Sequence, residues 1–123
     1  MRAMTRDERT LREGYEAFNR REIDTVLAFL DPEIEWIEPK GLPGARTARG
    51  HDEVRELLEE LFEVWGTSSY RPEAIEQDGD DLVATLRVTH RGQESGVVVE
   101  ALLKHRWTIR DGRATRLEQL GDA

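Results

Sequence analysis

The sequence contains no cysteine, so it forms no disulfide bond and builds no zinc site from thiolates. It has no apolar run near the ~20 residues that a membrane-spanning helix requires, and no apolar segment typical of a signal peptide. Basic residues are outnumbered, with 18 Lys and Arg against 26 Asp and Glu and a net charge of −8. Because nucleic-acid binding requires a basic face, we do not expect the protein to bind nucleic acid. Because a spanning segment and a signal-peptide segment are both missing, we expect a cytoplasmic protein that binds no membrane.

Signatures of metal and phosphate sites are also missing. The three histidines, His51, His90 and His105, have no spacing that suggests a metal site. The glycine-containing segment 41–50 has no Gly-Lys-Ser/Thr of a phosphate-binding loop. We therefore expect neither a metal nor a cofactor. With 123 residues, of which 37% are hydrophobic, the chain suits a single domain over residues 1–123 with one core.

Helical patterns dominate the first half of the chain. Thr5 and Glu8 have the spacing of a capping box at the start of a helix, and a shorter helix over 24–30 ends before a proline. The first helix carries one apolar stripe, formed by Leu11, Tyr15 and Phe18. A third helix is predicted from Val54 to Trp65, where apolar residues recur at helical spacing, with Gly66 as its C-terminal cap. Between the second and third helices we predict a strand over 34–38 and a loop over 39–50.

After Trp65 the hydrophobic period changes from 3.6 to 2. Strands are predicted over 70–77, 82–90, 97–110 and 113–120, with turns at Asp78-Gly79 and Asp111-Gly112. The longest strand has one apolar face that contains a single polar residue, His105: Val97, Val99, Ala101, Leu103, His105, Trp107 and Ile109. Helices followed by antiparallel strands indicate an α+β fold with the helices on one face of the sheet.

Four segments in this order resemble the NTF2-like superfamily, in particular its SnoaL-like branch, which includes relatives of ketosteroid isomerases and polyketide cyclases. They are YEAFN at 15–19, LDPEIEW at 30–36, RGHDEVR at 49–55 and WTIRDGR at 107–113. The resemblance implies an NTF2-like cone, in which three N-terminal helices pack on a curved antiparallel sheet around an apolar pocket. It does not specify the chemistry, because this fold hosts enzymes of several classes and non-catalytic binders.

Glu38, followed by Pro39, is the first candidate catalytic residue. The pair is similar to an Asp-Pro at the equivalent strand end of ketosteroid isomerases, where the aspartate is the general base. Glu38 shares a strand face with Trp36, and we expect a carboxylate beside an indole to lose hydration, which suits a base that works near neutral pH. The alternative is a solvated residue where the strand enters a loop.

Tyr15 and His105 are the candidates for stabilising a developing oxyanion. The resemblance places Tyr15 near the tyrosine donor of the isomerases and His105 near their second donor, which is a carboxylic acid there. A neutral His105 can donate a hydrogen bond to a carbonyl, or act as a base with Glu38. Both residues have a purely structural alternative: Tyr15 as part of the helix stripe, and His105 as a buried histidine with an internal partner.

Further residues are expected to line the pocket around this set. Trp36, Phe18, Leu103 and Trp107 would form apolar walls for a flat ligand, and Glu118 could serve as a base from the last strand. The face of Glu118 is ambiguous, because the patterns around Leu117 and Leu120 disagree. The ligand class that follows is a small apolar molecule.

The opposite face of the long strand carries Val98 and Leu102 among Glu100, Lys104 and Arg106. An exposed sheet face with apolar centres favours a homodimer through the sheet, and the alternative is a solvated face.

The function predicted from the sequence is binding of a small apolar molecule, with cofactor-independent acid–base catalysis of isomerase or polyketide-cyclase type on a carbonyl compound. The alternative is a non-catalytic ligand-binding domain or an accessory domain that binds a protein partner.

Overall fold

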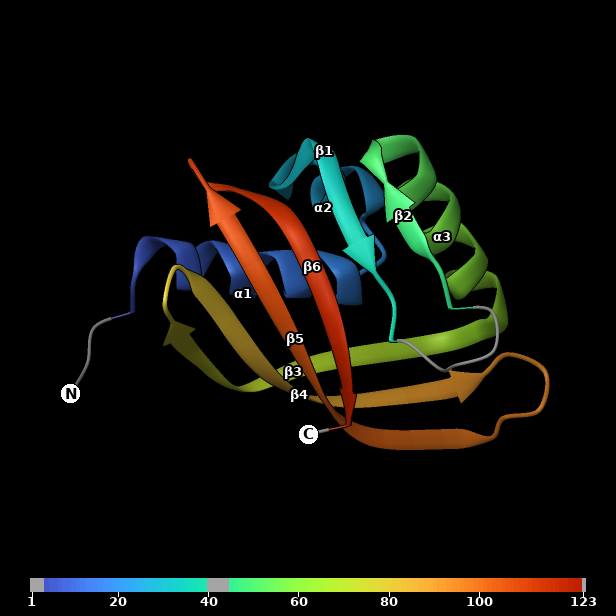
Figure 1. Cartoon of the computed structure of the whole chain (residues 1–123). Helices are drawn as coiled ribbons and strands as arrows, with labels where there is room; N and C mark the ends of the chain where they lie inside the picture. Colours follow the sequence, from blue (N-terminus) through green and yellow to red (C-terminus); the bar gives the residue numbers. More distant parts are fainter. Residues whose placement is uncertain (1–3, 40–44, 123) are drawn as a thin grey trace.

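The computed structural model describes residues 4–39 and 45–122 and has an α+β fold, as predicted (Figure 1). Its elements, in chain order, are α1 (Arg6–Asn19), α2 (Ile23–Phe29), β1 (Leu30–Ile37), β2 (Thr47–Arg49), α3 (Gly50–Val64), β3 (Trp65–Asp78), β4 (Asp81–Gly92), β5 (Val98–Arg110) and β6 (Arg113–Asp122). None of the described helices is long and apolar enough to span a bilayer.

The strands form one six-stranded sheet in the order β2-β1-β6-β5-β4-β3. Figure 1 shows that β4 and β5 bend along their length, so the sheet curves around α1. The expectation of an antiparallel sheet is wrong at one pair, because β1 runs parallel to β6. Alternation of apolar residues identifies a strand and its buried face, but it carries no information on the direction of the neighbouring strand.

The predicted loop over 39–50 contains the short strand β2, which was missed. Ala48 of β2 is buried opposite Trp36, and Arg49 pairs with Glu35. Three residues are too few to show a period. The strand predicted over 34–38, between the second and third helices, is confirmed as β1, which begins earlier, at Leu30. The remainder of the predicted loop, at 40–44, lies outside the described residues.

The start of α1 agrees with the prediction, since the Thr5 hydroxyl accepts a hydrogen bond from the Glu8 N–H at 3.1 Å. The predicted cap of α3 is wrong. The chain leaves this helix at Trp65 in an extended conformation, and Gly66 lies in β3. Arg21 instead donates hydrogen bonds to the carbonyls of Phe62 and Trp65, at 3.1 and 2.6 Å. A cap supplied by a distant residue leaves no local signal in the sequence.

The core lies between the helices and the concave face of the sheet. On β5 the predicted inner face is buried at His105, Trp107 and Ile109. Near the β4–β5 hairpin the same face is not covered, because the hairpin extends past the helices (Figure 1). Val97 and Val99 are therefore exposed. The β5–β6 hairpin has the predicted tight turn, with positive φ angles at Asp111 and Gly112 (51° and 79°).

Candidate active site

A cavity lies inside the curve of the sheet, between α1 and strands β1, β5 and β6. The space free of protein atoms at this site amounts to about 600 Å³, part of which is open solvent outside the cavity. Most of its walls are apolar, as expected where helices and a concave sheet face meet. The polar or titratable residues at the walls are Tyr15, Glu38, Tyr70, His105 and Gln119.

The structure brings together most of the residues predicted to form the site. Six of them line this cavity: Tyr15, Phe18, Trp36, Glu38, His105 and Trp107. They come from α1, from β1 and its end, and from β5. Segments up to 92 residues apart in the chain therefore meet in one place.

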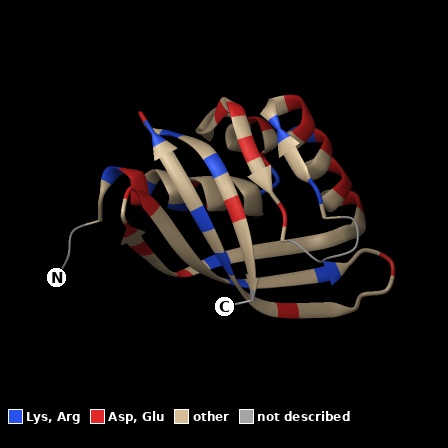
Figure 2. Cartoon of the chain, in the orientation of Figure 1, with Lys and Arg blue, Asp and Glu red and all other residues tan. Residues whose placement is uncertain are grey.

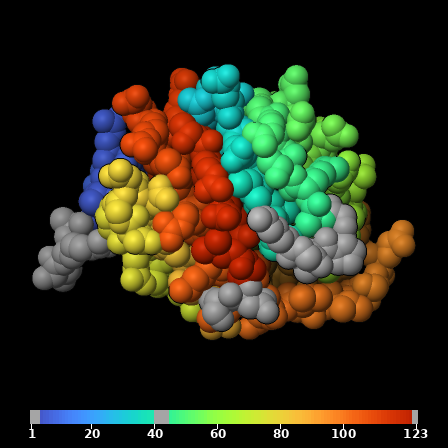
Figure 3. Space-filling model, viewed as in Figure 1, coloured from blue at the N-terminus to red at the C-terminus, as the bar shows by residue number. Residues whose placement is uncertain are grey.

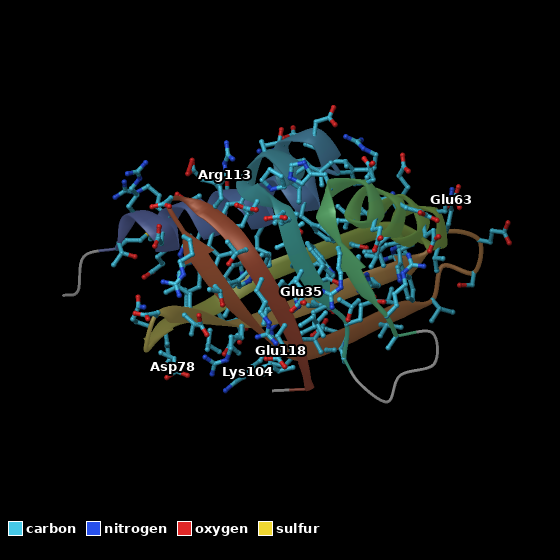
Figure 4. The ribbon with its side chains drawn as sticks, turned by 45° about the horizontal axis from the view of Figure 1, so that its top comes forward. Glu35, Glu63, Asp78, Lys104, Arg113 and Glu118 are labelled. Atoms are coloured by element: carbon cyan, nitrogen blue, oxygen red, sulfur yellow. The ribbon has the colours of Figure 1, made fainter. Side chains whose placement is uncertain are left out.

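Two predicted pocket residues lie elsewhere. On β6 the neighbours Leu117 and Gln119 line the cavity, so Glu118 projects from the opposite face, where its carboxylate lies 3.6 Å from the Arg116 guanidinium. Figure 4 shows Glu118 and Glu35 on the neighbouring strands β6 and β1. Leu103 packs against the core beside the cavity without lining it. The expectation for Glu118 fails because Leu120, which seemed to place it inside, is itself exposed.

Three buried side chains form a hydrogen-bonded chain in the cavity wall. The Trp107 Nε1–H donates to the Tyr15 hydroxyl at 2.8 Å, and this hydroxyl lies 2.9 Å from Nδ1 of His105. Burial raises the pKa of Tyr15 far above its usual value and lowers that of His105 to about 3. His105 is therefore neutral near pH 7, which suits a hydrogen-bond donor and disfavours a general base.

Glu38 is half-buried directly after β1 and extends the pairing of this strand. Its backbone N–H donates to the Arg46 carbonyl at 3.1 Å, and its carboxylate accepts from the Arg46 N–H at 3.3 Å. Burial, together with the negative charge of Glu38, raises the pKa of Tyr70 in the cavity wall to about 12. Glu38 is thus a carboxylate at the partly exposed side of an apolar cavity.

Sequence reasoning missed Tyr70 and Gln119 as lining residues. The sequence contains a signal for Gln119, because this residue lies two positions after the core residue Leu117 and therefore on the same face of the strand. Tyr70 begins the predicted strand over 70–77, but its position at the cavity depends on Asn19. The Asn19 side chain donates to the Tyr70 carbonyl at 2.9 Å and accepts from the Tyr70 N–H at 2.7 Å. These bonds attach the edge strand β3 to α1.

Trp65, expected to complete the apolar stripe of the third helix, belongs to a second aromatic group. Its ring stacks on His90 with 4.7 Å between centroids. His90 also lies 2.8 Å from the Ser68 hydroxyl and 3.4 Å from that of Tyr70. In the described part of the chain, no group of three or more metal-ligating residues is placed to hold an ion.

A curved sheet that encloses a cavity against its helices is the NTF2-like architecture, and the chain belongs to the SnoaL-like domain family, whose profile matches residues 11–117. Among solved structures, it is similar to TerC co-crystallised with polyporic acid, with 28% identity, a TM-score of 0.86 and coverage of 96% of this chain and 92% of TerC.

An NTF2-like protein of unknown function from Burkholderia pseudomallei is 29% identical, with a TM-score of 0.87 and coverage of 97% and 92%. A candidate polyketide cyclase from Xanthomonas campestris shares the fold at 20% identity, with a TM-score of 0.84 and the same coverage. No curated protein sequence matches the chain.

Proposed function

We propose that this protein binds a small apolar carbonyl compound in the cavity and catalyses proton transfer next to the carbonyl without a cofactor. The observation that carries the proposal is that a carboxylate, Glu38, and a neutral buried imidazole, His105, line the same apolar cavity. Such a pair suits proton abstraction by one group and stabilisation of the resulting oxyanion by the other.

In the proposed step, the substrate is a β,γ-unsaturated ketone, and the Glu38 carboxylate removes a proton from the carbon between the carbonyl and the C=C bond. The electrons of the C–H bond form a conjugated dienolate, and the carbonyl oxygen takes the negative charge. A hydrogen bond from His105 stabilises that charge more than it stabilises the neutral ketone. Protonated Glu38 then returns the proton to the γ-carbon, which re-forms the carbonyl, gives the conjugated isomer and restores the carboxylate.

Binding is tested first, with polyporic acid as the probe, because TerC was co-crystallised with it. Trp36 and Trp107 line the cavity, so a ligand there is expected to quench tryptophan fluorescence. Saturable quenching that is lost when Phe18 is replaced by Trp, which fills the cavity, would support binding at this site. Quenching that is the same in both proteins would place the ligand elsewhere.

Turnover is tested with 3-cyclohexen-1-one and its phenyl-substituted analogues, whose conversion to conjugated enones is followed by ultraviolet absorbance. We expect Glu38→Gln to lower the rate by about 100-fold or more, the usual contribution of a general base. The matched control is Glu33→Gln, which removes an exposed carboxylate of β1 outside the cavity. Equal activity in Glu38→Gln and wild type would remove Glu38 from the mechanism, and binding without turnover would favour a non-catalytic binder.

We also propose that two copies associate through the outer face of the sheet. Figure 2 shows acidic residues on β1, basic and acidic residues on β6 and basic residues on β5 on this face, and Figure 3 shows that these three strands form one continuous surface. Between the ion pairs, Val98 and Leu102 are 49% and 37% exposed. Native mass spectrometry tests this: wild type is expected to be a dimer and Leu102→Glu a monomer, whereas a monomeric wild type would refute it.

A further inference from the structure

The hydrogen-bonded chain in the cavity wall constrains where its protons lie. An indole N–H can only donate, so the Tyr15 oxygen must accept from Trp107. Two arrangements of the Tyr15–His105 bond are then possible. Either Tyr15 donates its proton to Nδ1 of His105, or Nδ1 carries a proton and donates it to Tyr15.

Counting unsatisfied groups separates the two arrangements. Nε2 of His105 is buried and has no hydrogen-bond partner among the described residues. If Tyr15 donates, the only group left without a partner is the proton on Nε2. If Nδ1 donates, two groups in this hydrogen-bonded chain lack partners. The Tyr15 hydroxyl proton has no acceptor, and the unprotonated Nε2 of His105 has no donor. Because each buried unsatisfied polar group is unfavourable, the arrangement that leaves only one such group is favoured.

This assignment changes the role of Tyr15. Its single proton is directed at Nδ1, so its hydroxyl is not available to donate to a ligand. Burial lowers the pKa of His105, and the imidazole stays neutral with its proton on Nε2. Tyr15 is therefore a positioning residue that fixes the His105 tautomer, and the donor that remains is His105 Nε2–H.

Trp36 provides a second unsatisfied donor in the same wall. Its Nε1–H is buried and has no partner among the described residues, and the whole residue is 6% exposed. Trp36 and His105 both pack edge-on against Trp107, with centroid distances of 6.2 and 6.4 Å. Both also line the cavity. Two buried N–H groups without acceptors among the described residues thus belong to rings that pack against the same indole.

We propose that Trp36 Nε1–H and His105 Nε2–H form the donor pair that recognises the ligand, so that its buried end carries an acceptor oxygen, a ketone, quinone or enolate. This inference rests on the proposed binding function and assigns a role to each donor. Both groups are already desolvated without a ligand, so an acceptor oxygen restores hydrogen bonds at little further cost. A hydrocarbon of the same shape leaves both donors unsatisfied.

The first experiment needs no ligand. In protein labelled with ¹⁵N, long-range ¹H–¹⁵N correlation spectra at pH 7 report which nitrogen of His105 carries the proton. We expect the Nε2–H tautomer in wild type and a mixture of tautomers in Tyr15→Phe, which lacks the hydroxyl that fixes the tautomer. A proton on Nδ1 in wild type would overturn the assignment of His105 and make Tyr15 the donor.

The second experiment compares two ligands of matched shape, 1-tetralone and tetralin, by calorimetric titration. Trp36→Phe is expected to weaken 1-tetralone binding by about tenfold, the value of one buried hydrogen bond, and to leave tetralin binding unchanged. Trp65→Phe is the control, because Trp65 is not among the residues that line the cavity. Equal effects of Trp36→Phe on both ligands would refute the donor role of Trp36.

A third measurement avoids any substitution. In wild type, 1-tetralone is expected to shift the Trp36 indole N–H resonance downfield, and tetralin is not. An unshifted resonance on saturation with the ketone would also overturn the proposal. If neither ligand binds, the proposed binding function fails, and the tautomer measurement by itself decides the assignment of His105.

Discussion

Burial of His105 makes the stability of the fold depend on pH in a defined window. Burial lowers the pKa of this residue from 6.5 to about 3. Between these pH values the unfolded chain binds a proton at His105 that the folded chain does not bind. The unfolded state is therefore favoured progressively as the pH falls, and the free energy of unfolding decreases.

The size of this effect follows from the two pKa values. Each pH unit inside the window costs about 1.4 kcal/mol, and the slope is smaller near pH 6.5, where protonation is incomplete. From pH 6.5 to 4.5 we expect His105 to account for a loss of about 2 kcal/mol. Above pH 7.5 the contribution vanishes, because the imidazole is neutral in both states.

Urea denaturation at pH 6.5, 5.5 and 4.5, followed by tryptophan fluorescence at one fixed protein concentration, measures the loss. The variant is His105→Gln, which keeps an acceptor for Tyr15 but does not titrate. We expect its profile to be flatter than that of wild type by about 2 kcal/mol over this range. His90→Gln is the control, since burial also lowers the pKa of His90 but this residue is only half-buried.

The comparison uses the slope with pH, so a uniform loss of stability in His105→Gln does not affect it. A profile as steep as that of wild type would show that His105 is not held neutral in the folded protein. Glu35 does not confound the comparison, because it contributes equally in wild type and His105→Gln. Its hydrogen bonds to Arg116 and Arg49 lower its pKa, so its contribution to stability begins to be lost near 4.5, its ordinary pKa, and is lost further at more acidic pH.

Three further predictions concern the frame around the cavity, each measured by urea denaturation at pH 7. Asn19→Ala removes both side-chain bonds to the Tyr70 backbone and is expected to cost about 1–3 kcal/mol, whereas an unchanged midpoint would mean that β3 does not need this attachment. Arg21→Ala removes two bonds to carbonyls at the end of α3 and is expected to cost about 1–2 kcal/mol, with Arg21→Lys partly restoring stability. Leu58→Ala empties a fully buried position and is expected to cost about 2–5 kcal/mol; a smaller loss would indicate that the core collapses around it.

The two residues of the proposed proton transfer, His105 and Glu38, come from different kinds of backbone position. Strand β5 supplies His105 and Trp107 from the interior of the sheet, where it pairs with β4 and, with an irregularity next to His105, with β6, whereas Glu38 lies after the end of β1. In the proposed mechanism, the donor His105 gains from a position within the sheet, and the base Glu38 gains from a strand end with partial solvent exposure.

The sequence by itself determined the helices, most strands and the face of β5 that is buried from His105 to Ile109. It did so because these features depend on local periods of 3.6 and 2, on the cap at Thr5 and on the turn at Asp111-Gly112. Strand parity also placed His105 and Trp107 on the inner face correctly, because successive side chains of a strand point to opposite faces.

The tertiary structure alone decided the features that require distant partners. The parallel pairing of β1 with β6, the cap of α3 by Arg21 and the exclusion of Glu118 from the cavity all depend on contacts between remote segments. The same is true of the proton on His105. The position of this proton follows from Tyr15, ninety residues away in the chain, and from the Trp107 indole, which can only donate. A local sequence pattern does not indicate that these side chains meet.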